Sequence, residues 1–352
     1  MKAVQEELVH NPENGVTGGI WRVRREDGTS AVRKILLPPG AAPSRAAYWA
    51  ASDRPAHWNW WRRELVAYER RAVEEWAEPA LDMPQLLDVT RRPDGAVELW
   101  LEDVAGEPGP RWQPEHHAAA ARALGRAQAR TAGPGPWRAW DGLSSGFIHD
   151  YAESKPVDEA VWTNDEAWSH EFVAPYLGPL RGALERLHVE RHRWYALLAR
   201  LPRTLCHLDV WPANLIARPD GRIVLLDWSF AGDGALGEDP GNLIPDSVFD
   251  LFVPGERIAE LDRAVTNAYL AGLAEAGWDG DPRLVRLAMC ASMVKYHWLA
   301  PYMVRGAASP QRHYGGAPME EAEHRYRQRG LAMAHLCALV DEARELERAL
   351  GL

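Results

Sequence analysis

The most informative stretch of the chain is LCHLDVWPANLIARPDGRIVLLDWSFAGDGALGEDPGNL, residues 205–243. Two short apolar runs, at 215–217 and 223–226, stand on either side of a Pro-Asp-Gly turn at 219–221. Apolar runs that flank such a turn predict a β-hairpin. The positions of the neighbouring polar residues can be worked out from this hairpin.

Three polar residues stand at the open end of the predicted hairpin. Asp209 and Asn214 come just before its first strand, and Asp227 comes just after its second. A tight hairpin brings these side chains to one end of the same two-stranded unit. A lone loop Asp is most simply a turn cap. Two carboxylates and an amide together suit a hard cation such as Mg²⁺, which takes oxygen ligands and leaves room for phosphate oxygens.

The order of these elements, H-x-D-x4-N, hairpin and D-W-S, resembles the catalytic core of the aminoglycoside phosphotransferases, a branch of the protein-kinase-like fold. The resemblance implies that Asp209 is the catalytic Asp, Asn214 the metal-binding Asn and Asp227 the metal-binding Asp of the DFG-equivalent position. The chain departs from the family at two positions. The family usually has Gly where Leu208 stands and often a second acid where Ser229 stands, so only Asn214 and Asp227 are supported as metal ligands.

The composition is that of a globular protein of ordinary size. The chain has 352 residues, enough for two lobes and a sizeable core, with 46% hydrophobic and 26% charged residues. Its net charge of −10 makes nucleic acid and anionic membranes poor partners. The three cysteines are too scattered for a disulfide framework or a zinc site. No N-terminal apolar run or membrane-spanning stretch is present, so we expect a cytoplasmic protein.

Residues 16–37 predict two strands joined by a turn. Gly18 and Gly19 precede the first strand, where glycines let a backbone approach a phosphate, although a plain turn explains them equally well. Lys34 lies on the second strand with apolar residues on the same face, and a buried lysine needs a partner. The resemblance implies that it is the strand lysine that holds the α- and β-phosphates of ATP. Arg33, on the opposite face, is the alternative because strand register alone does not exclude it.

A helix is predicted over about 58–76, since apolar residues recur there at spacings of three and four. Glu64 stands beside the apolar stripe, where a carboxylate is costly unless it is paired. The resemblance implies that Glu64 holds the strand lysine. The alternative is a solvated Glu beside Arg62 and Arg63.

Two more strands are predicted at 85–90 and 96–103. The chain then enters a Gly- and Pro-rich stretch, which we interpret as a hinge between an N-terminal lobe at 1–105 and a C-terminal lobe at 106–352. The resemblance implies that the hinge backbone around Glu102 and Val104 binds the adenine edge. The fold class is therefore α+β: a bilobal protein-kinase-like fold with a small N-terminal β-sheet lobe, one main helix in that lobe, and a larger, mostly helical C-terminal lobe.

The C-terminal half is predicted to be helical over about 114–131, 175–201, 255–276, 282–300 and 319–349. Residues 133–165 form an irregular segment with several aromatic residues, similar to the family's variable insert that builds the acceptor site. The aromatic residues of 295–302 are further acceptor-pocket candidates. Asp239, which we interpret as a helix N-cap, matches a family Asp that steadies the catalytic loop.

Taken together, the resemblance implies an ATP- and Mg²⁺-dependent phosphotransferase that acts on a hydroxyl of a small molecule, such as an aminoglycoside-like antibiotic, a sugar or an amino alcohol. One alternative is a Ser/Thr kinase that acts on a peptide in natural-product tailoring. The other is a catalytically silent nucleotide-binding scaffold. The sequence does not indicate the oligomeric state.

Overall fold

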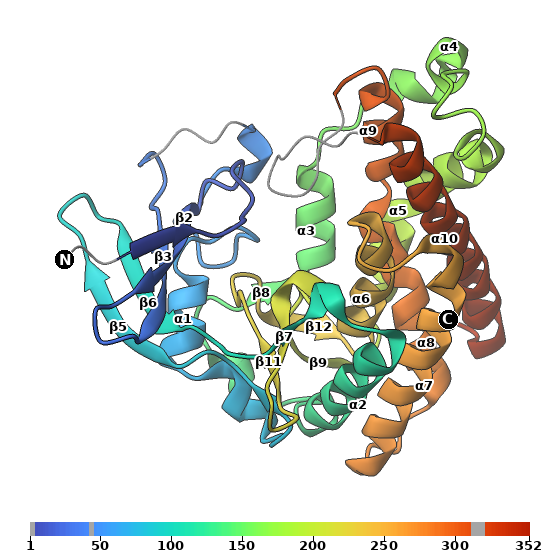
Figure 1. The fold of residues 1–352 in the computed structure, drawn as a ribbon. Helices are drawn as coiled ribbons and strands as arrows, with labels where there is room; N and C mark the ends of the chain where they lie inside the picture. Colours follow the sequence, from blue (N-terminus) through green and yellow to red (C-terminus); the bar gives the residue numbers. More distant parts are fainter. Residues whose placement is uncertain (1–3, 42–45, 311–320) are drawn as a thin grey trace.

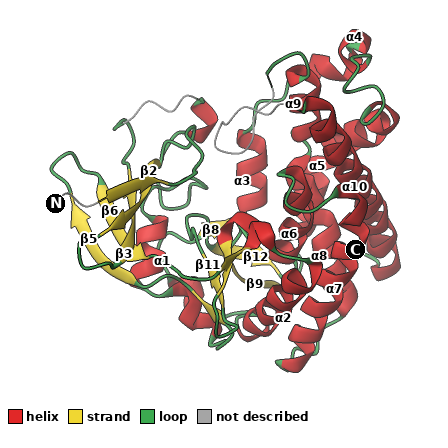
Figure 2. Cartoon of the chain, viewed as in Figure 1, coloured by secondary structure: helices red, strands yellow, loops and turns green. Residues whose placement is uncertain are grey.

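The structure, a computed structural model, describes residues 4–41, 46–310 and 321–352 (Figure 1). A β-sheet stands at the N-terminal side, helices fill the C-terminal side, and short strands lie between them (Figure 2). The α+β class and the division into a β-rich N-terminal part and a helical C-terminal part are as the sequence predicts.

The N-terminal sheet has five antiparallel strands in the order β1-β2-β3-β6-β5. Its strands are β1 (Val4–Glu7), β2 (Thr17–Arg24), β3 (Ser30–Leu36), β5 (Leu86–Arg91) and β6 (Val97–Glu102). Four of them match the predicted strands. The sequence does not reveal β1, because all four of its residues are exposed and it lacks an apolar alternation.

The predicted helix over 58–76 is wrong in its extent. Helix α1 spans only Arg63–Glu69, and a 3₁₀ helix, Ala72–Trp76, follows after Arg71, whose φ of 52° breaks the α-helix. Apolar spacings of three and four fit a short α-helix followed by a 3₁₀ turn as well as one long helix, because a 3₁₀ helix repeats every three residues. The apolar pattern alone therefore could not locate the break.

The predicted hairpin is present as β10 (Leu215–Ala217) and β11 (Ile223–Leu225), which pair in antiparallel register. It is the centre of a four-stranded sheet with the order β4-β11-β10-β7, in which the outer strands are β4 (Leu81–Asp82) and β7 (Glu107–Pro108). A third sheet, β8-β12-β9, lies beside it and contains β8 (Ser144–Ser145), β9 (Arg203–Cys206) and β12 (Gly232–Ala235).

The larger helices pack around these small sheets. They are α2 (Pro114–Arg130), α3 (Phe147–Ser154), α4 (Asp165–Trp168), α5 (Arg181–Leu198), α6 (Glu238–Phe249), α7 (Ile258–Glu275), α8 (Pro282–Ala291), α9 (Leu299–Gly306) and α10 (Ala322–Leu350). Helices α2 and α7 cross with their backbones in close contact. A Cβ at Gly125 would stand 2.3 Å from the Tyr269 carbonyl oxygen, and a Cβ at Gly272 would stand 2.1 Å from that of Arg122. Only glycine permits this approach.

Three helical predictions need correction. The segment 133–165 is not wholly irregular, since it contains α3. The helix predicted from 175 begins at Arg181, after a 3₁₀ turn that contains Pro179, because proline cannot continue a regular helix. The helix predicted over 282–300 is interrupted: α8 ends at Ala291, a 3₁₀ helix covers Ser292–Tyr296, and α9 restarts so that Pro301 falls in its first turn.

The last predicted helix is present as α10, although its predicted first residue, Met319, lies outside the described residues. The hydrophobic core runs without interruption from the N-terminal sheet through the hairpin to the C-terminal helices. Within the described ranges, no helix has the length and apolar character needed to cross a membrane.

Candidate active site

The loop before the hairpin brings Asp209 and Asn214 into direct contact. Asn214 Nδ2 donates hydrogen bonds to Asp209 Oδ2 at 2.8 Å and to the Asp209 carbonyl oxygen at 3.0 Å. Its amide oxygen is thereby left for another ligand. Asp209 is half-buried, and burial raises its pKa to about 7 against the opposing effect of the Lys295 ammonium. The two residues predicted from the H-x-D-x4-N spacing thus form one polar unit.

Asp239 supports this loop from α6. Its carboxylate accepts hydrogen bonds from the backbone N–H groups of His207 at 2.9 Å and Leu208 at 2.7 Å, and from Gln128 Nε2 at 2.7 Å. The predicted steadying contact is therefore present. The predicted N-cap role is wrong, because α6 begins at Glu238, and Asp239 lies inside its first turn.

Leu208 shows why glycine is usual at its position. Its φ is 65°, in the left-handed region, which costs an L-residue with a side chain roughly 1–2 kcal/mol. Its backbone N–H bonds to Asp239, and its side chain is buried in the core. The hydrogen bond and the side-chain packing together stabilise this backbone conformation.

His207 connects the loop to the far strand of the hairpin. Its Nε2 lies 2.9 Å from the Leu226 carbonyl oxygen, and its ring packs edge-on against Trp228. Burial lowers the pKa of His207 to about 4, so the ring is neutral at pH 7 and serves as a structural link between the Asp209 loop and Asp227.

Lys34 links three parts of the chain through its ammonium. Its Nζ lies 2.6 Å from Glu64 Oε2 on α1 and 2.9 Å from Asp227 Oδ1 after the hairpin. The predicted contact between Lys34 and Glu64 is therefore present. Arg33 faces the other way, with its guanidinium 4.8 Å from the Trp21 ring and a hydrogen bond to Gln5. The register thus favours Lys34 over the Arg33 alternative.

The charges of this cluster depend on one another. Burial disfavours the Lys34 ammonium, but the carboxylates of Asp227 and Glu64 outweigh it and raise the pKa of Lys34. Burial also disfavours ionised Asp227, but Lys34 and Ser229 outweigh it and hold its pKa below the usual value. At Glu64 burial dominates and raises the pKa to about 7. Asp227 is consequently the ionised partner of Lys34 at neutral pH.

Ser229, at the position where the family often has a second acid, contacts Asp227 instead of adding a charge. Its hydroxyl donates a hydrogen bond to Asp227 Oδ1. Asp227 itself has a φ of 57°, an uncommon backbone conformation, and its Oδ1 atom is the partner of both Ser229 and Lys34.

Arg63, which sequence reasoning treated only as a neighbour of Glu64, is one of the most deeply buried charged residues. All its donors are used on backbone carbonyl oxygens rather than on a carboxylate. The acceptors are Gly142 at 2.6 Å, Trp58 at 2.8 Å, Ser229 at 3.2 Å, Pro55 at 2.9 Å and His57 at 2.7 Å. The guanidinium therefore joins α1 to the Asp227 loop and to the segment before β8. No local sequence pattern signals this contact.

The predicted position of Gly18 and Gly19 is wrong. Gly18 and Gly19 do not precede the first strand but lie in β2, at a bulge. Gly19 has a φ of 140°, and a Cβ there would meet the Trp21 ring. The plain-turn alternative is also wrong, because the bulge lies within the strand. Sheet packing thus accounts for glycine at this position.

The hinge residues end the N-terminal sheet. Glu102 closes β6, and its carboxylate binds Arg218 at 2.7 and 2.8 Å, which connects β6 to the hairpin turn. This pairing lowers the pKa of Glu102. Val104 follows two residues later and is half-buried. Both residues lie where the chain leaves the N-terminal sheet.

The predicted acceptor-pocket aromatics separate into two groups. Phe147 and Tyr151 on α3 pack against Phe230, which follows the Asp227 loop. Trp137 and Trp162 lie in the core instead. Of the C-terminal candidates, Trp298 has its ring centroid 5.9 Å from the ammonium of Lys155, the residue that follows α3. His297 is buried against His188, and Tyr302 is exposed.

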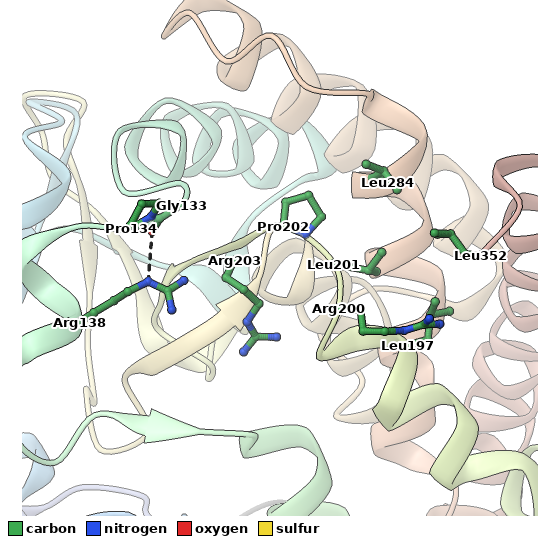
Figure 3. Close-up of a pocket in the computed structure, with 10 residues that line it drawn as sticks. All are labelled: Gly133, Pro134, Arg138, Leu197, Arg200, Leu201, Pro202, Arg203, Leu284 and Leu352. Carbon is green, nitrogen blue, oxygen red and sulfur yellow. Dashed lines mark hydrogen bonds between the residues drawn. The ribbon is translucent and has the colours of Figure 1, made fainter.

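A separate surface cavity of about 730 Å³ contains none of these residues (Figure 3). It is lined by Gly133, Pro134, Arg138, Leu197, Arg200, Leu201, Pro202, Arg203, Leu284 and Leu352. Two of its arginines, Arg138 and Arg203, are paired with Asp233. The volume of this cavity therefore does not identify the chemical site.

In the part of the chain that the structure describes, no three His, Cys, Asp or Glu side chains form a group that could hold a metal ion by themselves. Mg²⁺ in phosphate-binding sites needs only one or two carboxylates, since phosphate and water supply the other oxygens. The Asp227 carboxylate and the free amide oxygen of Asn214 fit that need.

A family model described as "Phosphotransferase enzyme family" matches residues 53–280, more than half of the chain. No curated protein matches the sequence. Among solved structures, the chain is similar to an aminoglycoside phosphotransferase from Alicyclobacillus acidocaldarius, with 17% identity, coverage of 99% of this chain and 94% of that one, and a TM-score of 0.53.

The chain is also similar to amicoumacin kinase hAmiN in complex with AMP-PNP, Ca²⁺ and Ami. The identity is 13%, the coverage 96% of this chain and 88% of that one, and the TM-score 0.52. A thermostable mutant of aminoglycoside phosphotransferase APH(4)-Ia in its apo form gives 14% identity, coverage of 96% and 94%, and a TM-score of 0.51. At these identities the similarity shows the fold, which is kinase-like as predicted.

Proposed function

Because the chain belongs to the phosphotransferase enzyme family, we propose that it moves the γ-phosphoryl group of ATP to a hydroxyl of a small molecule. The observation that carries the proposal is the joint arrangement of two units. Asp209 is hydrogen-bonded to Asn214, and Asp227 is paired with the Lys34–Glu64 couple. These are the polar groups that phosphoryl transfer by positioning and charge neutralisation requires.

Lys34 and its carboxylates would hold the nucleotide. The Lys34 ammonium is fixed between Glu64 and Asp227, so its position is set before ATP binds. In this arrangement it would contact the α- and β-phosphates. The hinge backbone at Glu102 and Val104 would bind the adenine, and the β2 bulge at Gly18 and Gly19 would lie over the phosphates.

Asn214 and Asp227 would hold Mg²⁺ through their oxygens. When bound, the cation neutralises charge on the β- and γ-phosphates. Ser229, which bonds to Asp227, would fix the direction of that carboxylate. Holding the nucleotide and orienting the acceptor hydroxyl would depend on the protein's own groups.

Asp209 would orient the acceptor hydroxyl and accept its proton at Oδ1. Asn214 Nδ2 holds the other carboxylate oxygen, Oδ2, so Oδ1 would be left for the acceptor. The silent-scaffold alternative has no support from a missing group, because Lys34, Glu64, Asp209, Asn214 and Asp227 are all present and in contact as pairs.

The test is steady-state kinetics of Asp209→Asn with an acceptor found in an ATP-consumption screen. General-base or orienting groups contribute about 10²–10⁴-fold, so kcat should fall on that order. The KM for ATP should change little, because Asp209 contacts the acceptor rather than the nucleotide. Asp220→Asn, an exposed acid in the turn of the same hairpin, is the matched control and should keep full activity. An unchanged kcat in Asp209→Asn would remove Asp209 from the mechanism.

A further inference from the structure

Lys155, at the end of α3, lies within a cluster of aromatic rings that no part of the mechanism above uses. Its Nζ is 3.8 Å from the ring centroid of Trp49 and 4.0 Å from that of Tyr151. Three further rings surround it at 4.7–5.9 Å: Tyr48, Trp58 and Trp298. We call these five rings the aromatic box.

The ammonium of Lys155 has no hydrogen-bond partner among the described residues, although the residue is buried, with a relative exposure of 6%. The rings stabilise its charge but offer no acceptor oxygen for its three N–H groups. A buried donor without an acceptor is costly and rare in native proteins. Trp49, Tyr151 and Trp298 are only half-buried, whereas the Lys155 Nζ atom is closed off from solvent, so a ligand would reach it by displacing one of these partly exposed rings.

The aromatic box is linked to the proposed catalytic residue through Lys295. Tyr151 contacts Lys155 on one side and lies 5.4 Å from Lys295 Nζ on the other. Lys295 in turn acts on the charge of Asp209, and it lines a small cavity together with Phe147 and Leu208. Helix α3, which carries Phe147 and Tyr151, stands between the N-terminal sheet and the C-terminal helices (Figure 1). A compound whose hydroxyl meets Asp209 would therefore extend toward Lys155.

The lysine content supports a special role for this residue. The chain has 40 lysine and arginine residues, but its lysines are only Lys2, Lys34, Lys155 and Lys295. The last three are buried. Because arginine supplies nearly all the surface cations of this chain, lysine stands mainly where a compact ammonium is enclosed. Lys34 and Lys295 have oxygen partners, and Lys155 lacks one.

We propose that the acceptor carries an acidic group that binds the Lys155 ammonium in the aromatic box, so that the substrate is a hydroxy acid rather than a polycation. This inference rests on the proposed function. A carboxylate or phosphate oxygen supplies the missing acceptor for the Lys155 N–H groups. The rings of Trp49 and Trp58 provide flat apolar surface for the rest of the compound. A polycationic acceptor would instead meet the two ammonium groups of Lys155 and Lys295, and the charge of Lys295 acts on Lys155 more strongly than that of the Glu13 carboxylate.

The test uses a panel of acceptors matched in size and different in charge. The acids are D-glucuronate and other hydroxy acids, the neutral compounds are D-glucose and other polyols, and the singly charged cations are D-glucosamine and amino alcohols. Aminoglycosides represent polycations. Two quantities are measured: kcat/KM for phosphorylation, and direct binding of each compound by calorimetry. The variants are Lys155→Met, Lys155→Glu and Lys155→Arg. Arg62→Met, which removes an exposed cation from the Trp61 ring, is the matched control.

We expect the wild type to favour acids. A charge-assisted hydrogen bond corresponds to about a 10–100-fold change in affinity, so Lys155→Met should lose that factor in kcat/KM and in binding for acids only. Lys155→Arg should recover part of the loss, and Lys155→Glu should reverse the preference toward cations. The control variant should behave as the wild type.

Three results would overturn the proposal: a wild type that prefers cationic acceptors, an acid whose kcat/KM is the same in Lys155→Met, or no binding of any acid in the panel. The proposed function can fail separately. If no compound receives phosphate while an acid binds in a Lys155-dependent way, the transferase activity is wrong, but the acid subsite stands.

Discussion

Two buried lysines have opposite surroundings in this molecule. Lys34 and Lys155 have relative exposures of 4% and 6%, so they are removed from water to the same degree. Lys34 lies between two carboxylates, which raise its pKa above the usual value. Lys155 lies between aromatic rings, and burial, with the nearby charge of Lys295, lowers its pKa to about 7. The partner of each ammonium, and not the depth of burial, decides its charge state.

The difference separates the proposed nucleotide side of the site from the proposed acceptor side. On the nucleotide side the Lys34 ammonium and the carboxylates of Glu64 and Asp227 are partners of one another. On the acceptor side the Lys155 ammonium lacks an acceptor atom among the described residues. Each prediction below compares the two lysines.

The largest expected effect is on activity. Lys34→Met should lower ATP turnover by about 10²–10³-fold, the loss typical of removing one positioned donor from an active site. Arg33→Met, a neighbour whose guanidinium lies against Trp21 on the opposite face, should keep normal turnover. Steady-state ATP consumption by both variants measures this. If the two variants lost activity equally, the functional distinction between the two faces of β3 would be wrong.

Stability should change in opposite directions in the two lysine variants. Lys34→Met leaves Glu64 and Asp227 without their cation, and breaking a buried pair costs about 3–5 kcal/mol. Lys155→Met removes an unpaired ammonium that costs about 1–3 kcal/mol, offset by lost cation–π contacts of about 0.5–2 kcal/mol. We therefore expect a net gain on the order of 1 kcal/mol. Denaturant unfolding of both variants provides the measurement. A loss of stability in Lys155→Met would contradict the view that its ammonium lacks a partner.

The smallest effect is the pH dependence of stability. The folded-state pKa of Lys155 is about 7, below its unfolded value, so the unfolded chain binds more protons above pH 7. The free energy of unfolding of the wild type should therefore rise relative to Lys155→Met by about 1 kcal/mol between pH 7 and pH 8. The stability that the wild type loses by burying a charged Lys155 is fully regained only above the unfolded pKa of the lysine, and it is lost again as the pH falls through 7.

The charged groups that act on Lys155 are Lys295 and Glu13. Both remain in Lys155→Met, so the difference in pH dependence between the two proteins comes from Lys155 itself. Unfolding of the two proteins is compared across this pH range without added acids. Parallel stability curves would mean that Lys155 keeps an ordinary pKa.

The catalytic loop was predictable because its information is local. The spacing from Asp209 to Asn214 and the turn between two apolar runs define a hairpin within a few residues, and the hairpin then fixes the position of Asp227. Strand and helix periodicity marks Lys34 and Glu64 each as a charge at an apolar face, and the resemblance to the family was needed to pair them. For residues such as these, the adjacent sequence contains the pattern from which the position of the side chain is predicted.

Arg63 and Lys155 were not predictable for the opposite reason. The partners of Arg63 are carbonyl oxygens, which every residue has, so no side-chain pattern marks them. Lys155 stands in a polar segment, and its rings come from positions before α1, on α3 and before α9. Helix ends were missed where Pro179 and Pro301 restart helices and where Arg71 takes a left-handed conformation, because apolar spacing does not record such breaks.

The contacts of Arg63 have a consequence for how activity can be controlled. Many two-lobed kinases are turned off when the helix that carries the Glu swings outward and the ion pair with the strand Lys opens. Here an outward swing of α1 would separate the buried Arg63 guanidinium from the Gly142 and Ser229 carbonyl oxygens, which lie on distant segments, while its other three partners lie at 55–58, just before α1. Those two hydrogen bonds therefore oppose an outward swing of α1. If the proposed function is right, we expect an enzyme whose output follows the amounts of protein, nucleotide and acceptor rather than a movement of this helix.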